Sequence, residues 1–127
     1  MQITHINAPT APAPVGGYSQ ALEVRGHTRL LFISGQVPED RHGEIPAVFA
    51  AQARLVWAHI VAQLRAVDMT VANLVKVTTF LSSRGHAHTN AEIRREMLGT
   101  KAPALTVLIT GIFDERWLLE IEAIAAE

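Results

Sequence analysis

The chain has 127 residues with a formal net charge of -1, and 49% of its residues are hydrophobic. This length suits one compact domain over residues 1–127 and excludes an enzyme with a separate cofactor-binding domain. The balanced charge offers no basic footprint to nucleic acid, and no apolar run approaches the roughly 20 residues that cross a bilayer. Without cysteine there are no disulfides or thiolate metal sites. We therefore expect a cytoplasmic domain that binds neither nucleic acid nor membrane.

The first half of the chain is expected to form two strands and a long helix. After a proline- and glycine-rich entry, the pattern predicts a strand from Tyr18 to Arg25, a tight turn, and a strand from Arg29 to Ser34, paired as a hairpin. Pro46 suits the first turn of a helix that continues for about two dozen residues. Its apolar stripe has helical spacing: Phe49, Ala53, Val56, Ile60, Leu64 and Val67.

The second half is expected to alternate strands with a second helix. Leu74 to Leu81 reads as a strand, and Ala87 to Leu98 reads as a helix that ends at Gly99. Strands from Ala104 to Thr110 and from Leu118 to Ala125 complete the chain. Since two helices can cover one face of a sheet this wide, the order predicts an α+β two-layer fold, a mixed sheet with both helices on one face.

The hydrophobic content of 49% is high for a domain of 127 residues, which predicts that the second face of the sheet is also covered. In the last strand one face carries Leu119, Ile121, Ala123 and Ala125, which suits contact with the helices. The other face carries Leu118, Glu120, Glu122 and Ile124. We expect the additional apolar residues on the sheet face opposite the helices, at Leu105, Val107, Leu118 and Ile124. We also expect a homo-oligomer in which other subunits cover this face.

Two carboxylates in the last strand are candidates for chemistry. Glu120 and Glu122 lie two residues apart, so their side chains share one face at a separation of about 7 Å. Paired carboxylates serve acid/base catalysis when one of them is buried enough to change its pKa. Their neighbours Leu118 and Ile124 favour partial burial. The alternative is a charged rim in water.

Two polar segments could line a ligand site. Tyr18 follows Gly16-Gly17 and either stands at a pocket mouth or packs as the first residue of a strand. Ser34-Gly35 ends an apolar strand, where either a ligand site or a simple turn is expected. Six histidines raise the question of a metal, but His86 and His88 point to different sides of a helix, so we expect no metal site.

Several segments together resemble one family in the same order through nearly the whole chain. They are APAPVGGYSQA, FISGQVP, AAQARLVWAHI, NLVKVTTFL, the helix that contains Asn90, KAPALTVL and LEIEAIA. These segments resemble the RidA/YjgF family of imine and enamine deaminases, also labelled endoribonuclease L-PSP. The resemblance implies a chorismate-mutase-like fold and a homotrimer with small-molecule pockets between subunits. It also implies hydrolysis of substrates such as 2-aminoacrylate to a 2-oxo acid and ammonia, without a cofactor.

The resemblance also implies roles for individual residues. Glu120 would orient or activate the attacking water as the catalytic residue. Tyr18 would line the pocket, Ser34 and Gly35 would contact the substrate beside it, and Asn90 would contribute from the second helix. The chemistry needs such groups because a positioned water and a polar, water-poor pocket lower the barrier to attack on C=N.

One motif departs from the family. The family's P-A-R-[ST] segment, whose arginine binds the substrate carboxylate, reads here as Pro103-Ala104-Leu105-Thr106. Leu105 therefore takes the place of the arginine, with Thr106 and Val107 beside it as further substrate contacts. Leucine has no donor, and losing a charge-assisted pair in a dry pocket costs about 2–5 kcal/mol of binding. We expect weak activity on 2-aminoacrylate.

Several functions remain open at this point. One is hydrolysis of an imine or related small molecule that has no carboxylate at that position. Another is binding of a small metabolite without turnover, and a third is deamination that uses another cation. The ribonuclease label is disfavoured because strand binding needs basic grooves and aromatic platforms, and only 6% of the residues are aromatic. A smaller departure is Gly17, where the family usually has proline.

Overall fold

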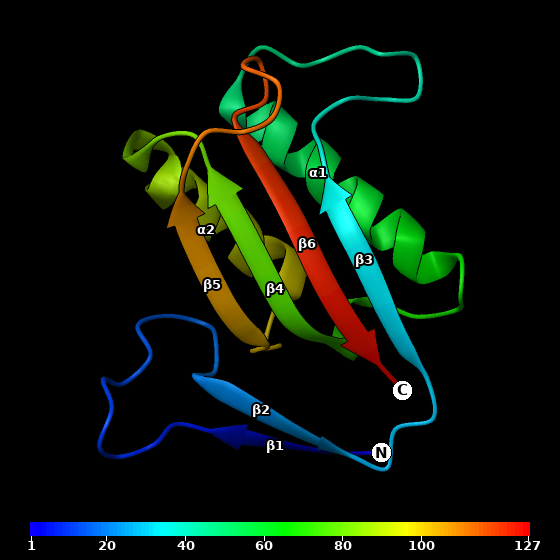
Figure 1. Cartoon of the computed structure of the whole chain (residues 1–127), viewed down its shortest axis with the longest axis vertical. Coiled ribbons are helices and arrows are strands. Elements are labelled where there is room, and N and C mark those ends of the chain that lie inside the picture. The colour runs from blue at the N-terminus through cyan, green and yellow to red at the C-terminus, as the bar shows by residue number, and fades with distance from the viewer.

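The computed structural model describes all residues, 1–127, and its main feature is a four-stranded sheet (Figure 1). The strands lie in the order β3 (Leu30–Gln36), β6 (Leu119–Ala126), β4 (Leu74–Leu81) and β5 (Ala104–Ile109). β4 and β5 are parallel, whereas β6 is antiparallel to both of its neighbours. The sheet is therefore mixed, as predicted.

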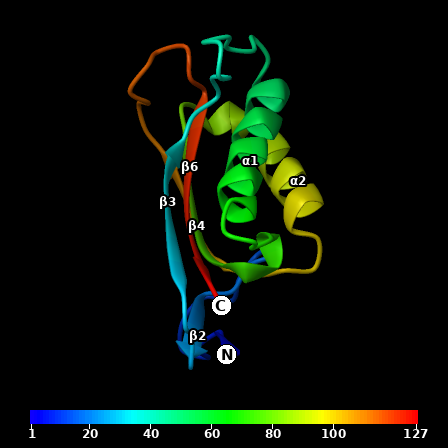
Figure 2. The ribbon, with the colours of Figure 1, turned by 90° about the vertical axis from the view of Figure 1, so that its right-hand side faces the viewer.

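Both helices pack on one face of this sheet. In the edge view of Figure 2, α1 (Phe49–Arg65) and α2 (Ala87–Leu98) lie on the same side, and the other face is open. The α+β two-layer prediction is confirmed. α2 has the predicted bounds, while α1 begins at Phe49, so Pro46 lies in the preceding loop rather than in the helix. Short 3-10 turns, η1 (Val71–Asn73) and η2 (Arg84–His86), precede β4 and α2.

The core lies between the sheet and the helices, where alternation and helical spacing place it. Its members include Val56, Trp57, Ile60 and Leu64 from α1, and Leu119, Ile121, Ala123 and Ala125 from β6, all almost completely buried. The predicted helix-facing side of β6 is thus confirmed. At about 25 cal/mol per Å² of apolar surface, this interface is the main stabilising contribution to the fold.

The N-terminal pairing differs from the prediction. The segment of β2 (Ala21–Arg25) does not form a hairpin with β3. It pairs instead with β1 (Gln2–Ile6), a strand that the sequence analysis missed, in a separate two-stranded sheet. β1 is exposed along most of its length, so its sequence carries no strong burial signal. β3 pairs with β6, because its apolar residues need the cover of the helices on one side.

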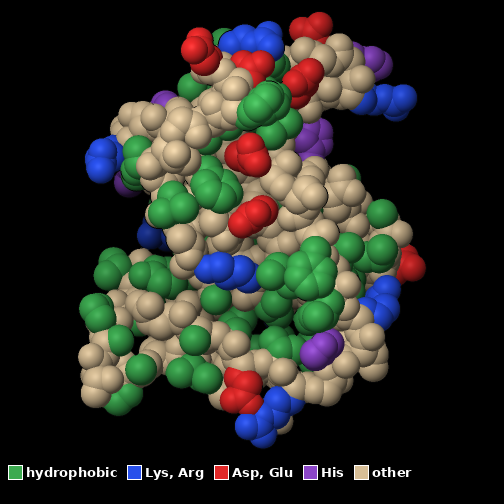
Figure 3. All heavy atoms as spheres, in the orientation of Figure 1, with side chains coloured by type: hydrophobic (Ala, Val, Ile, Leu, Met, Phe, Trp, Pro, Cys, Tyr) green, Lys and Arg blue, Asp and Glu red, His purple; other side chains and the backbone are tan.

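The open face of the sheet mixes apolar and charged side chains. Phe32 on β3 lies opposite Ile124 on β6, and Lys76 on β4 lies next to Ile124. Figure 3 shows this face, with hydrophobic side chains around charged ones. Phe32 is 70% exposed in the single chain, which is unusual for a large aromatic residue in a sheet.

Some of the apolar residues that we expected on the open face lie elsewhere. Leu105 and Leu118 pack against the core and not on the open face. On β5 it is Thr106 that faces the open side, where its hydroxyl accepts a hydrogen bond from Lys76 Nζ at 2.7 Å. Val107 lies beside buried Thr79 on the helix-facing side, at the edge of the sheet, and is 39% exposed. Of the four residues predicted on the open face, Ile124 alone lies there.

Candidate functional site

A bulge in β3 brings three predicted site residues together. Ile33 lies opposite Ala123 on β6, whereas Gln36 lies opposite Ile121, so β3 has one extra residue around Ser34 and Gly35. The Glu120 side chain lies across Gly35. A Cβ built on Gly35 would stand only 2.7 Å from Glu120 Cδ, so a residue with a side chain would displace the carboxylate.

The Glu120 carboxylate has surroundings that suit a base. Burial raises the pKa of Glu120, and the charge of neighbouring Glu122 raises it further. Glu120 takes part in none of the ion pairs of the chain. Glu122 lies on the same open face, as predicted, but is exposed. The two carboxylates therefore differ in environment, and Glu120 is the one suited to hold a water molecule and accept a proton from it.

The end of β6 that carries Glu120 is held in place by a buried glutamine. Gln52 on α1 is 1% exposed, and its Nε2 donates to the carbonyl oxygens of Pro46 and Arg116 at 2.8 and 3.0 Å. Its Oε1 accepts from the backbone N–H of Leu118 at 2.8 Å. Sequence reasoning did not single out Gln52, and a polar residue next to the apolar stripe of α1 was the available signal.

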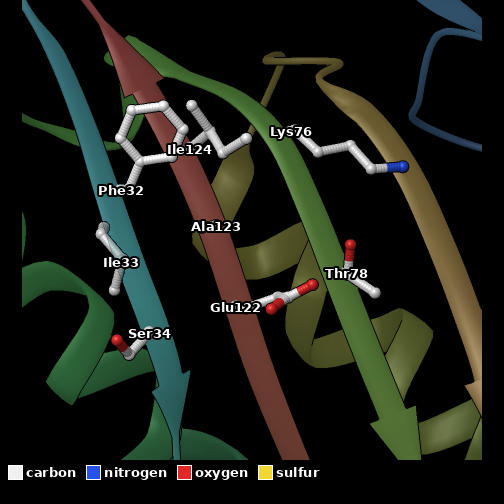
Figure 4. A pocket seen from close by; sticks show the side chains of 8 residues that line it. All are labelled: Phe32, Ile33, Ser34, Lys76, Thr78, Glu122, Ala123 and Ile124. Atoms are coloured by element: carbon white, nitrogen blue, oxygen red, sulfur yellow. The ribbon is translucent and has the colours of Figure 1, made fainter.

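Two hollows lie over the open face near these carboxylates. One is lined by Glu120, Phe80 and the loop residues Thr110, Gly111, Ile112 and Phe113. The other, shown in Figure 4, is lined by Phe32, Ile33, Ser34, Lys76, Thr78, Glu122, Ala123 and Ile124. In this view the Thr78 and Glu122 side chains lie beside each other. Lys76 was not predicted as a site residue, although the one charged residue of this strand was a visible signal.

The remaining predicted residues form a second group at the start of β5. Ser19 Oγ donates to the carbonyl oxygen of Ala102 at 2.8 Å, and Ser19 N–H donates to that of Pro103 at 3.1 Å. These bonds place the preceding residue, half-buried Tyr18, beside the first residues of β5. The Tyr18 hydroxyl accepts a hydrogen bond from the backbone N–H of Val15 at 3.3 Å.

Leu105 belongs to this second group, and Asn90 is buried on α2, where it is 2% exposed. Leu105 follows Ala104, which forms an isolated bridge with Ser19, so Leu105 lies near the Tyr18 loop while its side chain packs on the core. The group therefore combines a phenol and an apolar side chain.

One chain does not bring the two groups together. Glu120 pairs with Phe80 of β4, and Phe80 pairs with Leu108 of β5, four residues beyond the Ala104 that lies next to the Tyr18 segment. Two strand spacings and four residues of rise correspond to a separation of about 16 Å. A small substrate cannot bridge that distance within one chain.

We also searched the side chains for potential metal ligands that lie close together. No group of three or more histidine, aspartate or glutamate side chains lies close enough to hold a metal ion. Neither helix is both long and apolar enough to pass through a bilayer.

The fold and the site define a small α+β domain of the chorismate-mutase-like class, with polar groups on an open sheet face. Comparison with known proteins narrows this class. The sequence profile of the family described as Endoribonuclease L-PSP matches residues 8–127. The chain therefore belongs to this family, which contains the RutC and RidA/YjgF proteins.

Individual relatives agree with this assignment. The RutC family protein PH0854 of Pyrococcus horikoshii is 35% identical over 117 residues, which cover 91% of this chain and 90% of that protein. An Escherichia coli relative named "Putative reactive intermediate deaminase TdcF" is 29% identical over 124 residues, 94% of each chain. The crystal structure of YyfB from Yersinia pestis, of the Rid family, has a TM-score of 0.85 and 28% identity over the full length of both chains.

Proposed function

We propose that this protein hydrolyses small imines or enamines in a pocket between the subunits of a homotrimer, with Glu120 as the catalytic residue. The observation that carries the proposal is the Glu120 carboxylate, which lies over Gly35, has a raised pKa and has no cationic partner. Family membership and the name of the TdcF relative support the reaction class. No cofactor is needed for this chemistry, because water attacks the substrate directly.

In the proposed reaction a water molecule held by Glu120 adds to the carbon of the C=N bond. The carboxylate accepts a proton from the water as the new C–O bond forms, and the nitrogen takes up a proton. Glu120 then returns its proton to the nitrogen, the C–N bond breaks to release ammonia, and the hydroxyl gives its proton to the solvent that supplied the first proton on nitrogen, so that a carbonyl compound remains. An enamine enters the same sequence after protonation at carbon. A raised pKa favours each of these transfers, since it brings the carboxylate closer to the working pH.

The subunit boundary follows from the separation of the two residue groups. Glu120, Ser34 and Gly35 of one subunit would face Tyr18 and Asn90 of another, because a single chain holds Glu120 about 16 Å from the start of β5, beside which the Tyr18 segment lies. The exposed apolar residues of the open face, such as Phe32, support a partner that covers them. The small substrate would then be enclosed between two chains, with the backbone at Thr106 and Val107 at its edge.

The place of Leu105 alters the expected substrate. If this residue stands where the family has its carboxylate-binding arginine, a substrate such as 2-aminoacrylate loses its bidentate partner at that position. We therefore expect weak hydrolysis of 2-aminoacrylate. We place the reaction in the cytoplasm, where a chain without cysteine meets no redox constraint.

A second candidate function is binding of a small metabolite without turnover. The observation that favours it is the apolar, core-packed Leu105 in the second group, which offers no help to a charged intermediate. The same pocket would serve both functions, so only a rate measurement separates them.

The test follows the release of ammonia from imines that an amino acid oxidase generates in situ from several amino acids. Wild type is compared with Glu120→Gln and with the matched control Glu122→Gln, which removes the exposed neighbour. We expect Glu120→Gln to lower the catalysed rate by about 100-fold or more, and the control to stay near wild type. If the wild-type protein does not raise the rate above the uncatalysed rate for any imine, the hydrolysis proposal is wrong and the binding function takes its place.

A further inference from the structure

A buried arginine beside Tyr18 has no partner in the chain. Arg94 on α2 is only 6% exposed, and its Nε has no hydrogen-bond partner. It takes part in none of the five ion pairs. Arginine stays charged in proteins, and a buried charge without a counter-charge is costly, so buried arginines are nearly always paired. Within the single chain, no carboxylate forms an ion pair with Arg94.

The guanidinium lies beneath the loop that carries Tyr18. Gly16 has a positive φ of 104°, and a Cβ at that position would stand 3.9 Å from an Nη atom of Arg94 and 3.2 Å from one of Arg95. The head of Arg94 therefore lies beside the loop that carries Tyr18. Arg94 also lies one helical turn after Asn90, so both residues share one face of α2.

The electrostatic surroundings of Arg94 contain no negative side chain. Burial lowers the pKa of the Arg94 guanidinium, and neighbouring Arg95 lowers it further, whereas Tyr18 acts in the opposite direction. A cation built into the fold with this penalty is stabilised when an anion binds. Arg94 therefore has the properties of a ligand-binding residue: it is largely buried, it is charged, and its Nε has no partner in the chain.

We propose that Arg94 is the anion-binding residue of this protein and holds the carboxylate of its substrate together with Tyr18 and Asn90. This inference rests on the proposed function for the location of the site, and it deepens that function by naming the residue that would hold the substrate carboxylate in a chain with leucine at position 105. The cation is supplied from α2, not from β5, where Leu105 stands. The guanidinium has planar paired donors, which fit a carboxylate in bidentate geometry.

The position of Arg94 in the fold also determines where the substrate carboxylate would lie. Leu105 lies on a strand of the sheet, whereas Arg94 lies on the helix layer behind it. A substrate carboxylate held by Arg94 is therefore drawn toward the helix layer and away from the open face.

The test measures binding of pyruvate, a small 2-oxo acid, by isothermal titration calorimetry. Pyruvamide has nearly the same shape and no charge, and serves as the ligand control. Arg94→Met removes the cation but keeps an unbranched side chain, and Arg95→Met removes one positive charge from the exposed neighbouring position as the matched control. We expect pyruvate affinity to fall at least tenfold in Arg94→Met and less than twofold in Arg95→Met, with pyruvamide weak in all variants.

Thermal unfolding of the same variants excludes a purely structural role. If Arg94 awaits a ligand, Arg94→Met removes an uncompensated buried charge, and the unliganded melting temperature stays equal or rises. If Arg94 instead pairs with a carboxylate of another subunit, Arg94→Met lowers the melting temperature and leaves pyruvate affinity unchanged, which overturns the proposal. No pyruvate binding to the wild-type protein also overturns it.

The outcome is separable from that of the proposed function. This inference is refuted, and the hydrolysis proposal stands, if imine hydrolysis depends on Glu120 while the pyruvate affinity is the same in wild type and Arg94→Met. Pyruvate binding that depends on Arg94, without hydrolysis of any imine, would refute the hydrolysis proposal and leave the anion site standing.

Discussion

Replacement of Gly35 by alanine tests how the β3 bulge positions Glu120. A Cβ at residue 35 would stand 2.7 Å from Glu120 Cδ and 2.9 Å from its Cγ, so the side chain must rotate away. Gly35 does not have a positive φ, so alanine fits its backbone without strain. An altered rotamer costs roughly 0.5–1.5 kcal/mol, and the loss of glycine flexibility in the unfolded chain returns about 0.4–1 kcal/mol.

Gly35→Ala should therefore leave stability within about 1 kcal/mol of wild type, while displacement of the carboxylate lowers imine hydrolysis by about 100-fold. Chemical denaturation gives the free energy of unfolding, and ammonia release gives the rate. Gly85→Ala is the matched control, since a Cβ there makes an ordinary contact, 3.5 Å from Ser83 Oγ. A Gly35→Ala protein with the wild-type rate would refute the role of the glycine and weaken that of Glu120.

Two further predictions concern substrate charge and pH. Leu105→Arg should raise kcat/KM for 2-aminoacrylate at least tenfold, measured by pyruvate release in a coupled serine dehydratase assay, and no gain in a folded variant would contradict the proposed place of Leu105. Because burial and Glu122 raise the pKa of Glu120, the rate should rise with pH through a midpoint above the ordinary carboxyl range, and Glu122→Gln should lower that midpoint. The folded chain then binds this proton more tightly than the unfolded chain, so the contribution of Glu120 to stability falls as pH rises through the midpoint, and Glu120→Gln should abolish this dependence in denaturation curves.

Periodicity predicted most of the main layer of the fold. The apolar spacing of α1, the bounds of α2 and the alternation of β6 are local signals that tertiary packing reinforced. The pairing of β2 could not be predicted in this way. The turn between residues 25 and 29 looks like a hairpin turn, but β3 pairs with β6, a strand almost a hundred residues later in the chain.

The candidate site was predicted in part. Glu120, Ser34 and Gly35 meet at the bulge, but the bulge itself depends on a register that alternation does not encode. The orientation of β5 was wrong because Leu105 and Leu108 lie on opposite faces and are equally apolar, so the pattern did not define which face meets the helices. Arg94 was missed because an arginine in a helix of mixed pattern reads as a surface residue until its burial is known.

A mixed-subunit experiment tests the central claim, a site shared between chains, most directly. Glu120→Gln and Asn90→Ala chains, each inactive alone, are refolded together in equal amounts, and light scattering checks for a mass of three times 13.8 kDa. If Glu120 of one subunit works with Asn90 of the next, random assembly gives one intact site in four, and the mixture should recover about a quarter of wild-type imine hydrolysis. A mixture no more active than its separate components would contradict a site between subunits.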